Sequence, residues 1–332
     1  HLGRAESVVT QVARAHPSRT IMAMWSASDT SAITADVALH RVASGGPACG
    51  DAITVEATGQ AREWLPENAD RLALPDLPVC VWWVGDLPDY DRLFDRMAVA
   101  ADLVIVNSGE MDLRDLEKLS NVVARARGTC AVSDLTWIRL RPLQNLIARF
   151  FDDAAAAACL RTIDKVTIEF APRQDEKDVA STQAGLLLGW MASALSLRCE
   201  GVKWLRGAGW AEATLGGVVA RLVQRPRSDV PPGSVLLVSI ESAPAARFEI
   251  ERQDDPLLVR WSRDTPAAPM PPQVLRVAMH EEATLLVRCL ERPRRDPLFE
   301  RSLHAGSLIV RPVAPRLSTM PGPGGGAMSS QS

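Results

Sequence analysis

The sequence predicts an α/β protein: an N-terminal, mostly parallel sheet with helices on both faces, followed by an α+β C-terminal domain with an antiparallel sheet. In the first half, short apolar runs alternate with helical patterns, as parallel strands and their crossover helices do. In the second half, strand patterns follow one another with only short turns between them. A chain of 332 residues with 47% hydrophobic and 23% charged residues suits two globular domains.

The first strands are predicted from apolar runs and from period-two alternation. The run RTIMAMWS (19–26) indicates a strand, and ITVEA begins another at Ile53. Between them, apolar and polar side chains alternate over 33–40, which is typical of a half-buried strand. The turn-rich run SGGPACGD (44–51) separates the second strand from the third, and a helical pattern follows over 60–74.

The next strands are apolar on both faces. The run LPVCVWWVG (77–85) has this character, which is expected of a central parallel strand with helices on both sides, and it places Trp82 and Trp83 within the sheet. LVIVNS, from Leu103, indicates a second buried strand, and GTCAVSD (128–134) a shorter one. Helices are predicted over 91–100, 112–127 and 140–151.

The pattern changes after Arg161. VTIEFA (166–171) indicates a strand, and a long apolar helix is predicted after it. Consecutive strands are then predicted in ATLGGVVARLVQ, SVLLVSIES, ARFEIERQ, PLLVRWSR and LRVAMH, before a proline-broken helical end over 281–306. We expect an α/β domain over 1–158, an α+β domain over 159–310 and a disordered Pro/Gly/Ser-rich tail over 311–332.

The charge balance argues against polyanionic partners. The sequence has 37 basic and 40 acidic residues, a net charge of −3, and so no overall field that would attract nucleic acid or an anionic membrane. We expect neither as a partner. The first residues lack the apolar core of a signal peptide, and the six cysteines are scattered without a CxxC pair, so we expect a cytoplasmic location.

One segment resembles a membrane span in length. The stretch between Asp178 and Arg198 has no charged residue and approaches the roughly 20 residues that cross a bilayer. Its serine, threonine and glutamine residues dilute the apolar character, which favours a buried core helix.

The standard signatures of catalysis and cofactor binding are missing from the sequence. There is no GxGxxG after a strand pattern, no GxxxxGK[ST] and no GxSxG. The run His280-Glu281-Glu282 lacks the second histidine of HExxH, and no histidine lies near another in the sequence. We therefore predict no catalytic residues, no cofactor and no metal site.

Polar residues follow three predicted strands at the edge where α/β sheets bind ligands. They are Asp86, Asn107, Ser108 and Asp134. They suggest a ligand crevice at this edge. The alternative, which the residue types favour, is that they cap helices and form turns through local hydrogen bonds, since no base or nucleophile accompanies them.

A second candidate site lies in DLTWIRLRPLQNLIARFFDD (134–153). Trp137, Arg139 and Arg141 precede the predicted helix there, and tryptophan and arginine are enriched at binding hot spots. On an extended segment Arg139 and Arg141 would project from one face and could bind carboxylates or a phosphate. In the alternative interpretation, Trp137 plugs the sheet edge and the arginines pair with nearby aspartates.

Four stretches, taken in order, resemble the OpcA family of glucose-6-phosphate dehydrogenase assembly proteins. They are HPSRTIMA (16–23), LPDLPVCVWWVGDLP (74–88), ADLVIVNS (101–108) with the DLTWIRLRPLQNLIARFFD that follows, and RRDPLFERSL (294–303). The second is the most specific, because it resembles the LPDLPV–WW core of the family. One departure is Leu143, which stands where family members often carry tryptophan.

The resemblance implies a cytoplasmic, non-catalytic partner of glucose-6-phosphate dehydrogenase. Such a protein would promote assembly of the active dehydrogenase oligomer and so support the oxidative pentose phosphate pathway. The alternative from another class is a sugar- or nucleotide-phosphate enzyme that uses the carboxyl-edge crevice. The two differ in whether the purified protein turns over a substrate by itself.

Overall fold

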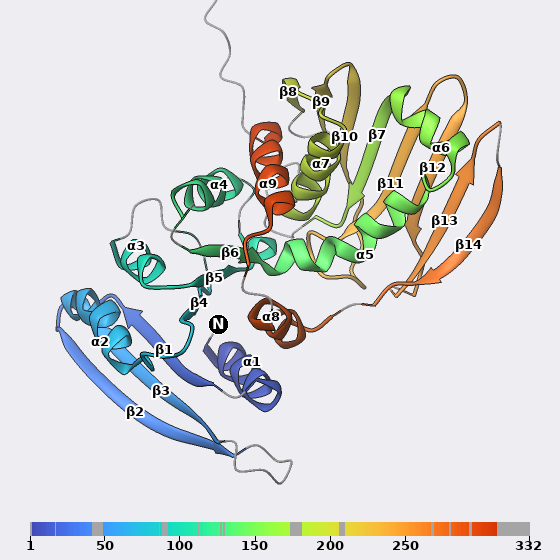
Figure 1. The fold of residues 1–332 in the computed structure, drawn as a ribbon. Helices are drawn as coiled ribbons and strands as arrows, with labels where there is room; N and C mark the ends of the chain where they lie inside the picture. The colour runs from blue at the N-terminus through green and yellow to red at the C-terminus, as the bar shows by residue number, and fades with distance from the viewer. Residues whose placement is uncertain are drawn as a thin grey trace, which may run out of the picture.

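The computed structural model describes most of the chain, and Figure 1 shows its elements. The described residues are 2–16, 18–41, 49–85, 87, 92–111, 113, 115–126, 128, 130–172, 181–205, 210–255, 257–266, 269–278, 280–291 and 294–310. The predicted tail over 311–332 lies outside them. The described strands form three sheets.

The first sheet is mixed and has the strand order β1-β3-β2. Its strands are β1 (Arg19–Ser26), β2 (Ala32–Arg41) and β3 (Cys49–Thr58). β3 runs parallel to β1 and antiparallel to β2. Alternate side chains of β3 (Ile53, Val55 and Ala57) are buried in the main core, together with residues of the 3-10 helix η1 (Gly59–Trp64) and of α2 (Leu65–Leu72).

The second sheet is short and entirely parallel. Its strands are β4 (Cys80–Trp82), β5 (Leu103–Val106) and β6 (Ala131–Asp134), and α3 (Arg92–Val99), η2 (Ser108–Glu110) and α4 (Asp115–Arg125) lie in the connections. Val104 and Val106 of β5 face the main core, whereas Leu103 and Ile105 face a second one. Residues of α1 (Leu2–Ala15) and α8 (Glu282–Glu291) complete the second core. The predicted burial of both sheet faces is confirmed for β5, which is buried at every position. It is wrong for β4, which was expected to be a central strand but lies at the edge of the sheet and is only half-buried.

The two adjacent tryptophans differ in burial. Trp83, directly after β4, is 7% exposed, and its ring packs against Trp25 and Phe94, with centroids 5.5 and 4.9 Å away. Its backbone N–H donates to the carbonyl of Ile105 at 2.9 Å, which extends the ladder beyond β4. Trp82 is half-buried and packs against the second core. Both side chains serve packing, but only Trp83 is fully within the core.

The third sheet has eight strands in the order β14-β13-β12-β11-β7-β10-β9-β8. They are β7 (Ile163–Phe170), β8 (Cys199–Leu205), β9 (Trp210–Leu215), β10 (Val218–Gln224), β11 (Val235–Ser242), β12 (Ala246–Arg252), β13 (Leu258–Asp264) and β14 (Met270–Arg276). All neighbours are antiparallel except β7 and β10. Strand and helix order therefore confirm the predicted α/β class with a mostly antiparallel C-terminal sheet.

Helices cover one face of the large sheet, as Figure 1 shows. They are α5 (Leu135–Arg149), α6 (Ala154–Ala158), η3 (Cys159–Arg161), α7 (Thr182–Ala194) and α9 (Pro297–Val310). α7 is the predicted core helix, since ten of its residues from Thr182 to Ala192 are buried. Across the described part of the chain, every helix is too short or too polar to cross a membrane.

Four features differ from the sequence prediction. The N-terminal strands form two separate sheets instead of one. The segment ATLGGVVARLVQ is a hairpin, because Gly216 and Gly217 take positive φ angles of 56° and 85° that turn the chain between β9 and β10. The strand β8 was not predicted, and the helix after β6 begins at Leu135 instead of Leu140.

Candidate functional site

The residues predicted to line a crevice converge at the carboxyl ends of β5 and β6. Asp134 lies at the end of β6 and is 1% exposed. Its carboxylate accepts from the Ser108 N–H at 2.9 Å, the Ser108 hydroxyl at 2.6 Å and the Thr136 N–H at 3.1 Å. Asp134 is thus the N-cap of α5. Burial raises the pKa of the Asp134 carboxyl, against the effect of these hydrogen bonds.

Asn107 connects β5 to two carboxylates. Its Nδ2 donates to Glu110 Oε1 at 2.9 Å and to Glu282 Oε1 at 3.2 Å. Its Oδ1 accepts from the Thr136 hydroxyl at 3.1 Å, and that hydroxyl accepts from the Gly109 N–H at 2.6 Å. The side-chain amide is therefore satisfied by the protein at both ends. Asp86, the fourth predicted crevice residue, lies outside the described residues.

Arg4 of α1 closes the edge from the N-terminal side. Its guanidinium donates to Glu282 Oε2 from Nε at 2.8 Å and from Nη2 at 2.6 Å, and it also pairs with Glu110. These contacts raise the pKa of Arg4, chiefly through the hydrogen bond to Glu110. We name as the carboxyl-edge cluster the residues Arg4, Asn107, Ser108, Glu110, Asp134, Thr136, Arg139 and Glu282.

Arg139 differs from the other members of this cluster in its hydrogen bonding. It lies on α5 and is half-buried, and its guanidinium makes no hydrogen bond to any residue that the structure describes. Burial lowers the pKa of Arg139, while the negative charges of Asp134, Glu282 and Glu110 act in the opposite direction. Arg139 was predicted as an interaction residue, but on an extended segment and not within a helix.

Trp137 and Arg141 share one partner, Asp296, which lies directly before α9. The Trp137 Nε1–H donates to Asp296 Oδ2 at 2.9 Å, and Arg141 Nη2 donates to the same oxygen at 2.5 Å. The Arg141 guanidinium also lies over the Trp137 ring, 5.5 Å from its centroid. Asp296 Oδ1 in turn accepts from the backbone N–H groups of Leu298 and Phe299, at 3.0 and 3.2 Å. Asp296 therefore caps α9 and fixes α5 against it.

The predicted extended arrangement of this segment is wrong. Trp137, Arg139 and Arg141 all lie within α5, so residues two apart point in different directions around the helix. Arg141 shares its side of α5 with Trp137, four residues earlier, and Arg139 faces the carboxyl-edge cluster. The cause is the Asp134 N-cap, which starts the helix five residues before the predicted position. Pro142 lies inside the helix without ending it.

Contacts of this kind also involve the stretches that carried the family resemblance. Arg19 donates to Asp51 from Nε at 2.9 Å and from Nη2 at 2.6 Å, which links β1 to β3. Trp137 and Asp296 join the third stretch to the fourth. A buried tryptophan and an aspartate 159 positions apart give no signal in a single sequence, and this contact was not predicted.

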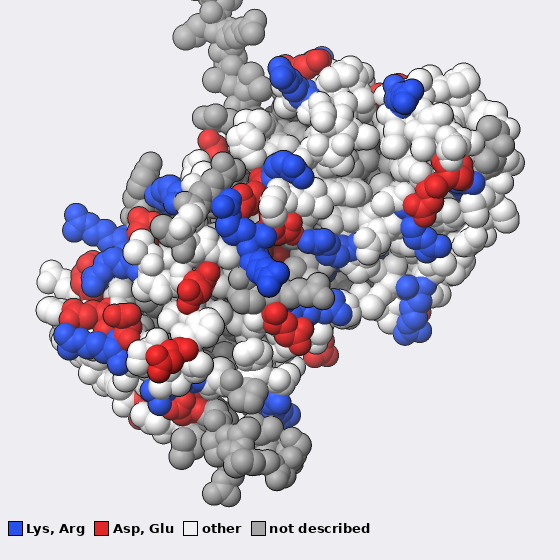
Figure 2. All heavy atoms as spheres, in the orientation of Figure 1, with Lys and Arg blue, Asp and Glu red and all other residues white. Residues whose placement is uncertain are grey.

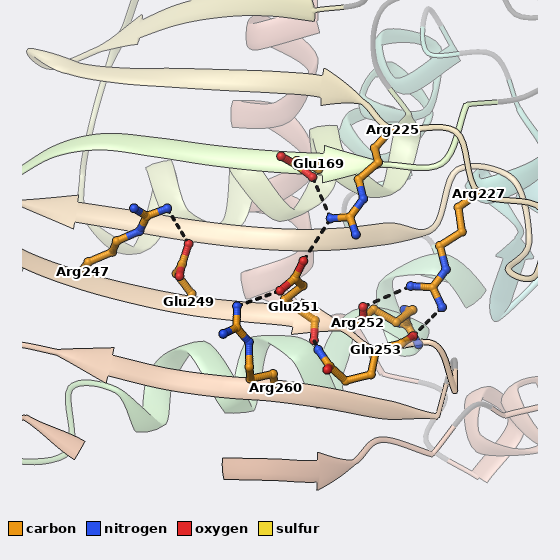
Figure 3. A network of polar contacts seen from close by, with 9 residues as sticks. All are labelled: Glu169, Arg225, Arg227, Arg247, Glu249, Glu251, Arg252, Gln253 and Arg260. Atoms are coloured by element: carbon orange, nitrogen blue, oxygen red, sulfur yellow. Dashed lines mark hydrogen bonds and ion pairs between the residues drawn. The ribbon is translucent and has the colours of Figure 1, made fainter. Parts of the chain in front are cut away.

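A second set of charged residues, also not predicted, lies on the side of the large sheet opposite the helices (Figure 3). Arg225 Nη1 contacts Glu169 at 3.1 Å and Glu251 at 3.2 Å, and Arg260 contacts Glu251 at 2.8 Å. The charges neutralise one another across three strands. Each such exposed pair contributes little to stability, about 0–1 kcal/mol. The strand alternation of charged and apolar residues was the sequence signal for this face.

The described residues offer little for metal or thiol chemistry. They contain no group of three or more His, Cys, Asp or Glu side chains that could hold a metal ion. Burial raises the pKa of the Cys289 thiol to about 12, so its thiolate is scarce at neutral pH. Acidic and basic side chains are interspersed over the face drawn in Figure 2.

Curated relatives carry one name. A cyanobacterial OxPP cycle protein OpcA from Synechocystis sp. is 29% identical over 197 residues, which are 57% of this chain and 39% of that protein. The OxPP cycle protein OpcA of Synechococcus elongatus is 28% identical over 280 residues, 79% of this chain and 60% of its own length. The chain thus spans well under half of the Synechocystis protein it matches.

A solved structure gives a more distant likeness. A 3-ketoreductase from Actinomadura kijaniata, in complex with TDP-benzene and NADP, matches 77% of this chain and 80% of its own with a TM-score of 0.47 and 15% identity. That level of similarity says nothing about the chemistry of this chain.

Family models match both halves. Residues 9–122 match the glucose-6-phosphate dehydrogenase subunit N-terminal domain, and residues 130–303 match the corresponding C-terminal domain. Together they cover the two short sheets, the large sheet and the α5–α9 contact. The chain belongs to the OpcA family of glucose-6-phosphate dehydrogenase subunits.

Proposed function

We propose that this chain is a non-catalytic assembly factor that binds glucose-6-phosphate dehydrogenase and promotes its active oligomer. The observation that carries the proposal is the match of both family models, in order, over residues 9–122 and 130–303. The role of such a protein is to supply a binding surface, and its effect on the oxidative pentose phosphate pathway would come through the dehydrogenase.

The geometry of the carboxyl edge supports a non-catalytic role. In α/β sheets, ligands enter beyond the carboxyl ends of the parallel strands. Here Arg4 pairs with both Glu110 and Glu282 at that edge, and Asn107 donates to both glutamates. A phosphate group entering there would meet two carboxylates and would have to displace Arg4. This arrangement disfavours the alternative of a sugar- or nucleotide-phosphate enzyme.

We propose Arg139 and Arg141 as contact residues for the dehydrogenase, with Trp137 in a supporting role. The Trp137 side chain is 2% exposed and can only hold α5 in place. The side chain of Arg141 is 47% exposed, even though it pairs with Asp296. Arg139 is half-buried and has carboxylates nearby, but it makes no ion-pair contact of 4 Å or less to a described residue. A guanidinium of this kind can bind a carboxylate on a partner bidentately.

Co-purification with the dehydrogenase tests the proposal. The two proteins, mixed at micromolar concentration, should co-elute from a sizing column, and the dehydrogenase should shift to a larger or more uniform oligomer with higher activity. The Arg139→Gln variant should keep its melting temperature and weaken activation about tenfold, or ~1.4 kcal/mol. Independent elution with unchanged dehydrogenase activity would overturn the assembly role, and turnover of a sugar phosphate by the chain alone would favour the enzyme.

A further inference from the structure

Among the described strands, none pairs with the outer side of β2, so one long side of the first sheet has no neighbour there. β2 forms the edge in the order β1-β3-β2, and Figure 1 shows it as the outermost strand of that part of the molecule. It pairs with β3 over all ten of its residues without a bulge. Side chains on both of its faces are exposed over 31–38. Long edge strands of this kind are templates for pairing with another strand.

The backbone groups on the open side can be assigned from one hydrogen bond. The Ala32 N–H donates to Thr58 Oγ1 at 3.1 Å, so Ala32 directs its backbone toward β3. Backbone direction alternates along an antiparallel strand. Ile33, Ala35 and Val37 therefore direct their N–H and C=O groups away from β3, toward the open side.

The same three residues form an apolar stripe. Their cross-strand partners on β3 are Ala57, Val55 and Ile53, which are buried in the main core. Ile33 is 41% exposed and Val37 is 70% exposed. An exposed strand that combines free backbone groups with an apolar stripe has what strand addition needs.

We propose that β2 pairs in antiparallel fashion with β2 of a second copy of this chain, with the two-fold axis at Ala35. The two three-stranded sheets would then form one continuous six-stranded sheet. A two-fold interface of this type uses the same surface on both copies. About six new backbone hydrogen bonds would form among the outward-directed residues.

The sequence of β2 fits this register better than the neighbouring ones. With the axis at Ala35, Ile33 lies opposite Val37 of the second copy, and Thr34 lies opposite Asp36 of the second copy. Directly opposite side chains on one face are about 4.5–5.5 Å apart, so the aliphatic pair makes contact and no like charges meet. Moving the axis to Asp36 would place two carboxylates opposite each other, which is destabilising. With the axis at Thr34, Ile33 would lie opposite Ala35 of the second copy and would lose its contact with Val37.

A hollow beside the start of β2 leaves room for the second copy. It has a volume of about 580 Å³ and is lined by Ser31, Gln60, Ala61, Glu63 and Trp64. Trp64 is 59% exposed. In the proposed register, position 39 of the second copy lies opposite Ser31, so the end of the incoming strand passes over this hollow. An interface limited to one strand and its rim is small, and the dimer should dissociate on dilution.

Substitution at Ala35 separates pairing from folding. Proline at 35 removes an N–H that faces solvent in the monomer, so the β2–β3 ladder survives, whereas pairing across the axis is blocked. Sedimentation of the full chain should show a concentration-dependent dimer, and Ala35→Pro should raise its dissociation constant at least about tenfold. Ala35→Val keeps the N–H and should dimerise as the unsubstituted chain does. Matching circular dichroism and melting of Ala35→Pro would confirm that the monomer fold is intact.

Cross-linking tests the position of the axis. Only the residue on a two-fold axis faces its own copy, so Ala35→Cys should be joined efficiently by a short bis-maleimide. Ala32→Cys should not, because Ala32 would lie opposite position 38 of the second copy, about 20 Å along the strand from the Ala32 of that copy. The unsubstituted chain, with its own cysteines, is the control. A chain that is monomeric at about 100 μM, or an Ala35→Pro variant that still dimerises, would overturn the proposal. Loss of dehydrogenase co-elution in Ala35→Pro without any dimer would instead assign the edge to the dehydrogenase.

Discussion

At the scale of single residues, Asp296 has two separate roles, one for each carboxylate oxygen. One carboxylate oxygen accepts from Trp137 and Arg141 of α5, and the other accepts from two backbone N–H groups at the start of α9. Trp137 is buried and its ring lies 5.7 Å from that of Phe299, so the indole N–H depends on Asp296 as its hydrogen-bond acceptor. The arginine is half-exposed and can be solvated if the aspartate is removed.

These differences predict the order of stability losses at this contact. Asp296→Ala removes a helix cap and leaves the buried Trp137 N–H unpaired, and the two effects together should cost about 2–4 kcal/mol. Arg141→Gln removes a partly exposed ion pair and should cost about 1 kcal/mol or less. Urea unfolding of the variants measures both. Equal losses in the two variants would mean that the ion pair, and not the cap and the indole, holds α5 to α9.

At the scale of elements, the strands that carry the strongest pattern were predicted and those that depend on distant partners were not. β5 is apolar at every position because both of its faces are covered, and that pattern is local in the sequence. The start of α5 was misplaced because Asp134 was interpreted as a crevice residue as well as a cap, and the cap determines where the helix begins. The division into two N-terminal sheets depends on strand pairing, which no local pattern encodes.

The candidate site was predictable only in part, for a similar reason. Asn107, Ser108 and Asp134 follow apolar strands, and this local feature identified them. Their partners Arg4 and Glu282 come from the two ends of the chain, 278 positions apart, and reach the edge only because α1 and α8 pack together. A sequence without such long-range information shows an open crevice where the folded protein has an ion-pair cluster.

The crossing of α7 and α9 depends on two glycines. A Cβ atom at Gly189 would collide with the Ser302 carbonyl and with the backbone of Gly306, and one at Gly306 would lie 2.8 Å from the Gly185 carbonyl. These obstacles are backbone atoms, which cannot move aside as the end of a flexible side chain can. The two helices can therefore approach closely only without side chains at these positions.

Gly189→Ala should separate the two helices and destabilise the protein by about 3 kcal/mol. The matched control is Gly3→Ala on α1, where a Cβ would meet nothing within 4 Å. Alanine there should be neutral or slightly stabilising, because it has the higher helix propensity. Thermal unfolding of the two variants gives the comparison. If Gly189→Ala has the same melting temperature as the unsubstituted protein, α7 and α9 can move apart at little cost, contrary to this prediction.

At the scale of the whole molecule, the last two helices join parts that lie far apart in the sequence. α8 completes the core on one face of the short parallel sheet, where Leu285 and Cys289 pack with Leu103 and Ile105. α9 packs against both α7 and α4. Residue 158 separates the strands of the two short sheets, β1 to β6, from those of the large sheet, β7 to β14. Each half nevertheless buries apolar surface that belongs to the other.

This arrangement predicts that residues 1–158 do not fold stably as a separate fragment. Without α8, the side chains of Leu103, Ile105 and Leu135, each at most 1% exposed in the full chain, lose their cover on one side of the sheet. Burial of a leucine or isoleucine side chain is worth about 1.5–3 kcal/mol, so the loss at three positions approaches the whole stability of a small domain. The fragment should bind a hydrophobic dye and lack near-ultraviolet circular dichroism, as expanded states do. Co-expression with residues 159–332 should restore both signals to those of the full chain. A fragment that unfolds cooperatively by itself would show that the N-terminal sheet needs neither α8 nor α9.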